Sequence, residues 1–255
     1  MNNIHKDANI GSNPKIGSYV TIESDVVIGD NVVIGPNAVI LSGTRLGSGC
    51  KIHSGAVVGG DPQDLKYAGE KTYLEIGDNV VIREFCTINR GTIDRHKTVV
   101  GSNCLLMAYT HVAHDCILGN NVILSNTVNV AGHVKIDDYA ILGGGTLVHQ
   151  FASIGKHVMI GGGSLVRKDV PPYVKAAREP LSFVGVNSIG LQRRDFDKDV
   201  ISEIQDIYRQ LYQKSSNITN GVTDVTELFK QSDIRDEILG FISQSERGIM
   251  KGHTS

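Results

Sequence analysis

Tryptophan is absent from this 255-residue chain, and proline is scarce, with 6 residues against 29 glycines. Aromatic residues make up only 5% of the chain, whereas hydrophobic residues as a whole reach 40%. A glycine-rich, aromatic-poor chain that keeps Val and Ile is typical of short strands separated by tight turns. Long apolar runs are missing as well, since none approaches the roughly 18 residues of a membrane span. The composition therefore predicts no membrane span.

An excess of charge of one sign is also missing. The chain has 25 Lys and Arg against 27 Asp and Glu, a formal net charge of -2, which argues against nucleic-acid binding by bulk electrostatics. The four cysteines lack the CxxC spacing of metal sites, so we expect reduced thiols in a cytoplasmic protein. Cys50, Cys86 and Cys104 share a position in an 18-residue frame, where we expect them to be small packing groups.

A period of six residues runs through most of the chain. Of the 28 positions taken in steps of six from Ile4 to Val166, 25 are Ile, Leu or Val, whereas chance would supply about seven. Neither a helix nor a continuous strand has this period. It indicates a short strand, a corner and a repeat of both, so that three hexapeptides close one coil and the stacked coils form a parallel β-helix.

The three exceptions to the period, Asp64, Glu70 and Asp94, fall in two polar segments. We interpret residues 60–73 and 90–97 as loops extruded from the coil, and loops on a rigid scaffold tend to carry function. The predicted organisation is a parallel β-helix over residues 1–190 and a small helical domain over 191–255. In the latter, Val200, Ile204, Ile207 and Leu211 fit one helical face with Asp197 as N-cap, and a further helix is expected over 234–242.

Four of the nine histidines lie close together in the sequence, at positions 111, 114, 133 and 149. In the 18-residue frame His114 aligns with Gly132 and Gln150, which are the neighbours of His133 and His149, so we expect a line of imidazoles on one outer edge, with coils ~4.8 Å apart. Three interpretations remain open from the residues alone. The line could be solvated edge histidines, an acid/base site, or a zinc site formed by His111, His114 and His133.

Longer motifs carry a resemblance to a known family. The hexapeptide period with QDLKYAGE at 63–70, IREFCTINRGT at 82–92, HVAHD at 111–115 and GVNSIGLQRR at 185–194 resembles the UDP-N-acetylglucosamine acyltransferases of lipid A biosynthesis. The resemblance covers essentially the whole chain. It implies a left-handed β-helix, a homotrimer with active sites between subunits, no cofactor and no metal. The implied reaction moves a 3-hydroxyacyl chain from acyl carrier protein to the 3-hydroxyl of UDP-N-acetylglucosamine.

The same resemblance implies the roles of individual residues. His114 matches the general base, Asp115 the acidic neighbour that tunes it, and Gly132 the glycine whose N–H faces the oxyanion. Gly162 matches the end of the acyl groove, where a glycine predicts a long acyl chain. The remaining matches are groups that contact the substrates, namely Asp64, Lys66, His111, His133, His149, Gln150, Asn187, Arg193 and Arg194.

Two other functions compete with the acyltransferase. One is a zinc enzyme on the same scaffold, similar to the γ-class carbonic anhydrases. The other is a β-helix subunit without catalysis, which has no use for a row of edge histidines.

Overall fold

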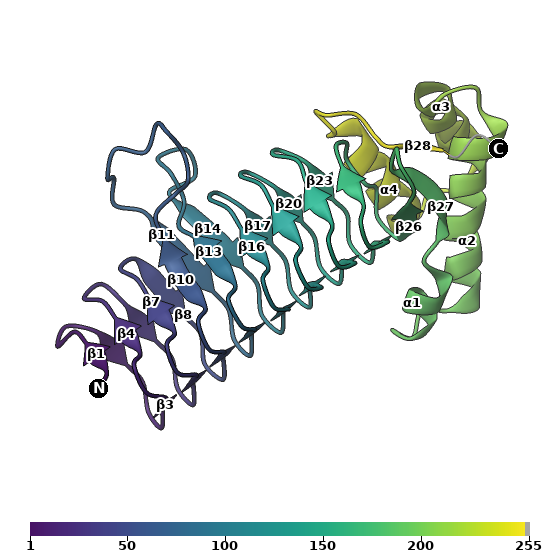
Figure 1. The fold of residues 1–255 in the computed structure, drawn as a ribbon. Coiled ribbons are helices and arrows are strands. Elements are labelled where there is room, and N and C mark those ends of the chain that lie inside the picture. Colours follow the sequence, from purple (N-terminus) through teal and green to yellow (C-terminus); the bar gives the residue numbers. More distant parts are fainter. Residues whose placement is uncertain (253–255) are drawn as a thin grey trace.

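The computed structural model of the protein describes residues 1–252. Its main feature is a long solenoid of parallel coils with a cluster of helices at the C-terminal end (Figure 1). Strands pair with strands one coil further on, as in the register of Asn3 with Thr21 and of Asn129 with Leu147. This spacing of three hexapeptides is the one that the sequence predicts.

Three sheets form the flat sides of the solenoid. Sheet A comprises β1 (Asn3–Ile4), β4 (Thr21–Ile22), β7 (Val39–Ile40), β10 (Val57–Gly60), β13 (Thr87–Asn89), β16 (His111–Val112), β19 (Asn129–Val130), β22 (Leu147–Val148) and β25 (Leu165–Val166). Sheet B comprises β2 (Asn9–Ile10), β5 (Val27–Ile28), β8 (Thr44–Leu46), β11 (Tyr73–Ile76), β14 (Lys97–Val100), β17 (Ile117–Leu118), β20 (Lys135–Ile136) and β23 (Ser153–Ile154).

Sheet C extends beyond the coils into the C-terminal part. It comprises β3 (Lys15–Ile16), β6 (Val33–Ile34), β9 (Lys51–Ile52), β12 (Val81–Ile82), β15 (Leu105–Leu106), β18 (Ile123–Leu124), β21 (Ile141–Leu142), β24 (Met159–Ile160), β26 (Val174–Ala177), β27 (Ser182–Val186) and β28 (Lys251–Gly252). All pairs in it are parallel except β26 with β27, which form an antiparallel hairpin. The three edges between the sheets are named here the A–B, B–C and C–A corners.

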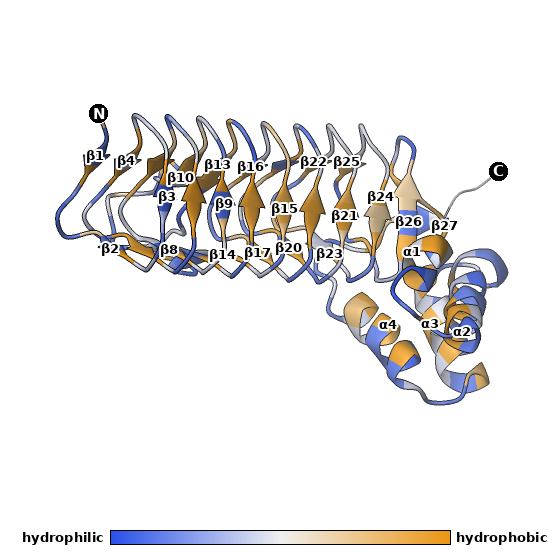
Figure 2. Cartoon of the chain, turned by 90° about the horizontal axis from the view of Figure 1, so that it is seen from below, coloured by the Kyte–Doolittle hydropathy of each residue, from blue (hydrophilic) through white to orange (hydrophobic). Residues whose placement is uncertain are grey.

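The core is a column of aliphatic side chains inside the coils. Figure 2 shows that the strands that contribute them are coloured mostly as hydrophobic. The residues of the six-residue period point inward, and Ile40, Ile82 and Leu124 are fully buried. A second residue, two positions earlier, is buried beside each of them, as Ala38 and Val80 are. Each flat side therefore contributes two inward side chains, and stacked coils bury both because one hexapeptide alone cannot.

The corners explain the glycines that follow the aliphatic residues. At Gly101 an added Cβ would lie 2.5 Å from the carbonyl oxygen of Gly119 in the next coil, so crowding excludes a side chain there. Left-handed backbone occurs two positions later instead, as at Asn103 and Asn121 (φ 59° and 58°). Asn tolerates this conformation better than most residues, but bulkier residues occupy it at some corners.

The two extruded loops lie where the sequence predicts interruptions, between β10 and β11 and between β13 and β14. Across the first loop Val57 pairs with Thr87, five hexapeptides further on, and across the second Thr87 pairs with His111, four hexapeptides further on. Because of these longer registers, the three cysteines that share a position in the 18-residue frame do not all lie on the same sheet. All are buried as expected, but Cys86 precedes a strand of sheet A, whereas Cys50 and Cys104 precede strands of sheet C.

Up to residue 252, the C-terminal part contains four α-helices, which are packed at the end of the solenoid (Figure 1). They are α1 (Ser188–Gln192), α2 (Lys198–Arg209), which continues as the π-helical turn η1 (Gln210–Lys214), α3 (Ile218–Leu228) and α4 (Asp233–Ser243). The helices predicted near 200–211 and 234–242 are present, whereas α3 was not predicted. Residue 190, the expected boundary, lies inside α1. Asp197 occupies the N-cap position of α2, but its side chain accepts no capping hydrogen bond.

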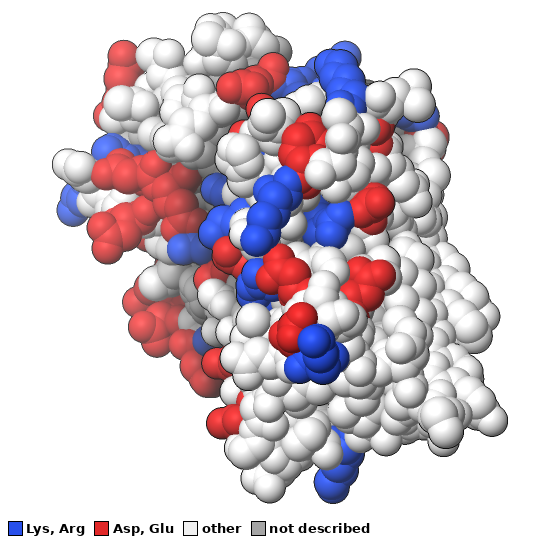
Figure 3. All heavy atoms as spheres, turned by 90° about the vertical axis from the view of Figure 1, so that its left-hand side faces the viewer, with Lys and Arg blue, Asp and Glu red and all other residues white. Residues whose placement is uncertain are grey.

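The predicted fold class, a mainly β solenoid of parallel coils with a small helical C-terminal part, is confirmed. Charges are mixed on the face seen in Figure 3, where Lys and Arg lie among Asp and Glu and much of the surface carries neither. Within residues 1–252, no helix is both long and apolar enough to cross a membrane.

Candidate active site

A cavity of about 340 Å³ lies where the two extruded loops meet the A–B corner. The first loop contributes four of its lining residues, the second contributes three, and the corner contributes two. The lining is formed by Asp64, Lys66, Tyr67, Glu70, Thr92, Ile93, Asp94, His133 and Phe151. The loops therefore convert one edge of a solid solenoid into a concave, charged site.

His114 and Asp115 occupy the A–B corner directly after β16. The Nδ1 atom of His114 lies 2.8 Å from Oδ2 of Asp115. Side chains of adjacent residues on a strand point apart, but Asp115 has left-handed backbone (φ 59°), which turns the two side chains toward each other. Because an ionised carboxylate only accepts hydrogen bonds, Nδ1 of His114 carries the proton and Nε2 is left as the basic nitrogen.

The carboxylate of Asp115 is fully buried and is held by the second loop. It accepts hydrogen bonds from the backbone N–H of Thr92 at 3.0 Å and of Arg95 at 3.2 Å, and from the hydroxyl of Thr92 at 2.7 Å. Burial favours the neutral acid, but the hydrogen bonds from His114 and Thr92 outweigh it and lower the pKa of Asp115 below its ordinary value. The site thus holds an ionised aspartate beside an imidazole.

His133 lies one coil above, at the corner position equivalent to that of Asp115. Its ring meets the ring of His114 edge-on, with centroids 5.1 Å apart, and stacks on Phe151 at 4.6 Å. An oxygen of Asp94 comes within 3.2 Å of its Nδ1 without the alignment of a hydrogen bond. His114 and His133 are therefore packed together, and both are largely covered.

Gly132 lies directly above His114. A Cβ built on Gly132 would lie 2.7 Å from Cε1 and 2.8 Å from Nε2 of the His114 ring. Only glycine leaves room for the imidazole in this position. The basic nitrogen consequently faces the backbone of the next coil.

The other two histidines of the group lie apart from this pair, so one continuous line of imidazoles does not form. His111 is on sheet A, where its Nδ1 is 2.7 Å from the hydroxyl of Thr87, and burial lowers its pKa. His149 and Gln150 are exposed, and Nδ1 of His149 faces the carbonyl oxygen of Gln150 at 3.1 Å. Gly132 and Gln150 do follow His114 at intervals of one coil, as predicted, but His149 precedes the corner whereas His133 lies on it.

In the first loop, the backbone N–H of Lys66 donates to Oδ1 of Asp64 at 2.9 Å, a local turn that turns both residues toward the cavity. The remaining predicted residues lie at other corners of the same chain. Gly162 is exposed at the C–A corner, where an added Cβ would lie 3.0 Å from the carbonyl oxygen of Gly144.

Three residues predicted to contact the nucleotide lie near the B–C corner and flank α1, with Asn187 before the helix and Arg193 and Arg194 after it. Asn187 is buried and donates to the carbonyl oxygen of His157 at 2.9 Å. The guanidinium of Arg194 lies over the ring of Tyr139, 5.2 Å from its centroid, while Arg193 is exposed. Within one chain, therefore, these residues do not line the cavity of the A–B corner.

The alternative zinc site of His111, His114 and His133 does not assemble as such. The donor atoms that do lie within 4.8 Å of one another belong to His114, Asp115 and His133. The Asp115 carboxylate already accepts hydrogen bonds on both oxygens from Thr92, Arg95 and the imidazole. These donors occupy the lone pairs that a metal would need.

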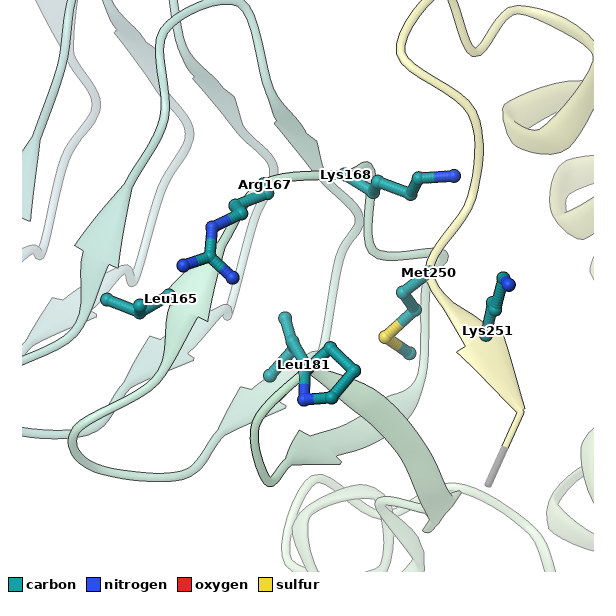
Figure 4. A pocket seen from close by; sticks show the side chains of 7 residues that line it. Leu165, Arg167, Lys168, Leu181, Met250 and Lys251 are labelled. Carbon is teal, nitrogen blue, oxygen red and sulfur yellow. The ribbon is translucent and has the colours of Figure 1, made fainter. Parts of the chain in front are cut away.

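A second cavity, of about 270 Å³, lies at the junction of the coils and the C-terminal part (Figure 4). Leu165, Pro180, Leu181 and Met250 form its apolar lining, and Arg167, Lys168 and Lys251 surround it with positive charge. Leu165 belongs to β25 of sheet A, three strands beyond β16, which carries His111.

Sequence reasoning assigned no role to several groups of this site. Thr92, Asp94 and Phe151 line the cavity, and the backbone N–H of Arg95 donates to the Asp115 carboxylate. The break in the period located their loop, but the period contains no information on how an extruded loop folds back. The place of Phe151 could have been predicted, because Asp115, His133 and Phe151 follow one another at intervals of 18 residues and so share a corner position.

Known acyltransferases match this protein along most of the chain. The family profile described as Udp N-acetylglucosamine O-acyltransferase, Domain 2, matches residues 169–250, and that of the bacterial transferase hexapeptide (six repeats) matches 7–42, 25–60 and 97–132. The acyl-[acyl-carrier-protein]–UDP-N-acetylglucosamine O-acyltransferase of Chlorobaculum parvum is 58% identical over 207 residues, which are 81% of this chain and 78% of the relative. Its counterpart in Aquifex aeolicus is 55% identical over 209 residues, 79% and 78% of the two chains.

Solved structures of acyltransferases are also similar to this structure. The UDP-N-acetylglucosamine acyltransferase of Bacteroides fragilis has a TM-score of 0.96 at 47% identity, with 98% of both chains covered. The Arabidopsis enzyme has a TM-score of 0.84 at 34% identity, again with 98% of both chains covered. The chain thus belongs to the family of acyl-[acyl-carrier-protein]–UDP-N-acetylglucosamine O-acyltransferases.

Proposed function

We propose that this protein transfers a 3-hydroxyacyl chain from acyl carrier protein to the 3-hydroxyl of UDP-N-acetylglucosamine, the first step of lipid A biosynthesis, with His114 as general base. The observation that carries the proposal is the buried pair of His114 and Asp115, with Nδ1 of the imidazole 2.8 Å from the carboxylate. A sugar hydroxyl is a poor nucleophile at pH 7, and a base with a fixed tautomer is what its activation needs.

In the proposed reaction Nε2 of His114 takes the proton of the sugar hydroxyl as its oxygen attacks the thioester carbonyl. The new C–O bond forms and the carbonyl becomes an oxyanion. The C–S bond then breaks, and the imidazolium returns the proton to the sulfur of the carrier. Asp115 stabilises the transient charge on the imidazole, as a buried carboxylate does in related dyads.

Two features make Gly132 suitable for binding the oxyanion of the proposed reaction. An added Cβ would collide with the His114 ring, so the acyl group can approach the backbone closely only with glycine at this position. Its N–H also donates to no protein acceptor among residues 1–252. A free N–H fixed beside the base is the geometry that stabilises a developing negative charge.

For the sugar nucleotide, we propose that Asp64, Lys66 and His133 contact the substrate inside the cavity of the two loops, whose lining they share. His111, His149 and Gln150 then border its outer side on sheet A and at the corner.

The nucleotide contacts call for a second copy of the chain. Asn187, Arg193 and Arg194 lie at another corner, so we propose a homotrimer in which they reach the A–B corner of a neighbour. A mixture of His114→Ala and Arg194→Ala chains tests this. Refolded together, the two inactive variants should regain part of the wild-type activity, because some mixed trimers contain one intact site. No recovery from verified mixed trimers would contradict a shared site.

For the donor, we propose that the acidic carrier protein docks at the basic cavity of Arg167, Lys168 and Lys251 (Figure 4). Opposite charges favour encounter and register. Leu165 is three coils from His111 in sheet A, about 14 Å at roughly 4.8 Å per coil. A thioester on a flexible arm could cross such a distance along the face of sheet A.

The zinc hydratase is the weaker candidate, because the carboxylate of the only cluster of three donors within residues 1–252 is taken up by hydrogen bonds. The deciding experiment is product formation from UDP-N-acetylglucosamine with a panel of 3-hydroxyacyl carrier proteins, for wild type and His114→Ala. We expect an ester product from wild type and a loss of about 10²- to 10⁴-fold in the variant, the range of general-base catalysis. Absence of product with every donor, from folded wild-type protein, would refute the proposed function.

A further inference from the structure

The two extruded loops are joined at their bases. The backbone N–H of Arg90, at the start of the second loop, donates to the carbonyl oxygen of Gly60, where the first loop leaves the coil, at 2.8 Å. The N–H of Gly91 donates to the carbonyl oxygen of Tyr73, where the first loop returns, at 3.1 Å. Both ends of the first loop are therefore attached to the first two residues of the second loop.

The side chain of Arg90 extends this junction into the loop itself. It is only 13% exposed, and its guanidinium donates to the carbonyl oxygen of Ser42, to the carboxylate of Asp61 and, at 3.1 Å, to the hydroxyl of Tyr67. Ser42 belongs to the coil, whereas Asp61 and Tyr67 belong to the first loop. Gly43 leaves room for this side chain, since a Cβ there would lie 2.8 Å from Cδ of Arg90.

Further hydrogen bonds connect Tyr67, the partner of Arg90, to the lining of the cavity. The hydroxyl of Tyr67 donates to the carbonyl oxygen of Glu70 at 3.2 Å, and the carboxylate of Glu70 accepts the N–H of Ala68 at 2.8 Å. Tyr67 and Glu70 line the cavity together with Asp64 and Lys66. The hydroxyl of Tyr67 thus joins the loop segment that carries the cavity's charged groups to the guanidinium of Arg90.

Buried polar atoms without partners gather at the same junction. Among residues 1–252, Oγ1 of Thr72, Oδ1 of Asn89 and Nε of Arg90 are buried and make no hydrogen bond. Such atoms are costly, and in native structures they call for an explanation. A structural contact alone could be made more cheaply with apolar side chains, which points to a functional reason for the guanidinium.

We propose that Arg90 is a positioning residue that fixes the first extruded loop, with Asp64 and Lys66, at a set distance from His114. The side chain of Arg90 makes no hydrogen bond or ion pair with His114 or Asp115. The second loop serves both ends of the site, because its first residue holds the substrate-binding loop and its later residues, Thr92 and Arg95, hold the Asp115 carboxylate. The role in substrate binding rests on the proposed function, whereas the ordering of the loop does not.

The test compares Arg90→Met with wild type and with Arg83→Met, in which an exposed arginine paired to Glu84 is changed instead. The first readout is hydrogen exchange of the amides in residues 60–73, which needs no substrate. In Arg90→Met we expect exchange at Lys66, Tyr67 and Ala68 to be faster by about tenfold or more, as for the loss of a hydrogen bond to a charged group. The strands of the coils should exchange as in wild type.

The second readout is steady-state kinetics. Arg90→Met should raise KM for UDP-N-acetylglucosamine by about tenfold while leaving the pH profile of kcat in place. Thr92→Val should instead shift that profile, because it removes a hydrogen bond to Asp115. Arg90→Lys should restore the affinity only in part, since an ammonium lacks the planar fork that reaches three acceptors.

Unchanged exchange and an unchanged KM in Arg90→Met would overturn the proposal, and so would a loss confined to kcat with a shifted pH profile. If wild type shows no activity with any donor but the loop exchanges faster in Arg90→Met, the proposed function fails and the ordering role stands. Should Arg90→Met not fold, Tyr67→Phe and Asp61→Asn remove the loop-side partners singly. Wild-type exchange over 60–73 in both of them would overturn the proposal equally.

Discussion

Replacement of Asp115 by Asn tests the tautomer argument with almost no change of volume. Oδ1 of Asp115 accepts two backbone N–H groups, from Thr92 and Arg95, so the amide oxygen of an asparagine is held at this position. The amide NH2 then takes the position of Oδ2, where the Thr92 hydroxyl and Nδ1 of His114 now donate. A donor would face the Nδ1–H of His114.

The imidazole escapes this conflict by moving its proton from Nδ1 to Nε2. The nitrogen facing Gly132 then carries a proton and cannot accept one from the sugar hydroxyl. We therefore expect kcat/KM to fall by about 10²- to 10⁴-fold, the contribution of general-base catalysis. Loss of the hydrogen-bonded carboxylate should also lower the free energy of unfolding by roughly 1–3 kcal/mol.

The assay is kcat/KM for UDP-N-acetylglucosamine from pH 5 to 9, with thermal unfolding of the same samples. Asp7→Asn is the matched control, because its carboxylate is 65% exposed beside another imidazole, that of His5, and does not line the cavity. An exposed pair contributes about 1 kcal/mol or less, so the control should lose no more than about fivefold. A folded Asp115→Asn enzyme that is no more impaired than the control would refute the tautomer argument.

Three further predictions concern other parts of the structure. His157 is buried between Tyr139 and Tyr173, and burial, with Arg194 and Lys156 nearby, lowers its pKa from 6.5 to about 4. The unfolded chain therefore binds this proton first as the pH falls, and stability should drop by about 3 kcal/mol between pH 6.5 and 4. His157→Phe should lose that much less in urea unfolding at these two pH values, and equal losses would exclude the histidine as the cause. Gly132→Ala should keep the fold but lose at least about tenfold in kcat, because its Cβ displaces the His114 ring; an unimpaired rate would contradict the crowding. Gly162→Met should shift the preferred acyl donor to a shorter chain in a panel of carrier proteins, and an unchanged preference would show that Gly162 does not measure chain length.

The regular part of the fold could be predicted from the sequence because each coil repeats one physical requirement, an aliphatic residue on every flat side. The bounds of the two loops were predicted as well, but their effect on the register of the strands was not. Registers of five and four hexapeptides replace the usual three there, so the period kept its phase across both loops while the flat side changed. Cys86 therefore precedes a strand of sheet A, although it lies 18 residues before Cys104, which precedes a strand of sheet C.

The site was predictable only in part for a similar reason. The spacing of three hexapeptides aligned His114 with Gly132, because no loop interrupts the chain between them. The pairing of His114 with Asp115 contradicts the alternation of a strand and depends on left-handed backbone at the corner. Contacts of Thr92 and Arg95 depend on how a loop folds back, for which a hexapeptide pattern carries no signal.

The three exceptions to the period show how a repeat protein can acquire a binding site. Asp64, Glu70 and Asp94 occupy positions that are aliphatic in every other hexapeptide, and all three line the cavity of the A–B corner. A carboxylate cannot enter the dry interior of a coil, so the exchange of an aliphatic residue for an acid expels that hexapeptide from the solenoid. The same exchange delivers a charged group to the surface beside the next coils. In evolutionary terms, one kind of substitution can both release a loop and equip it for a polar substrate.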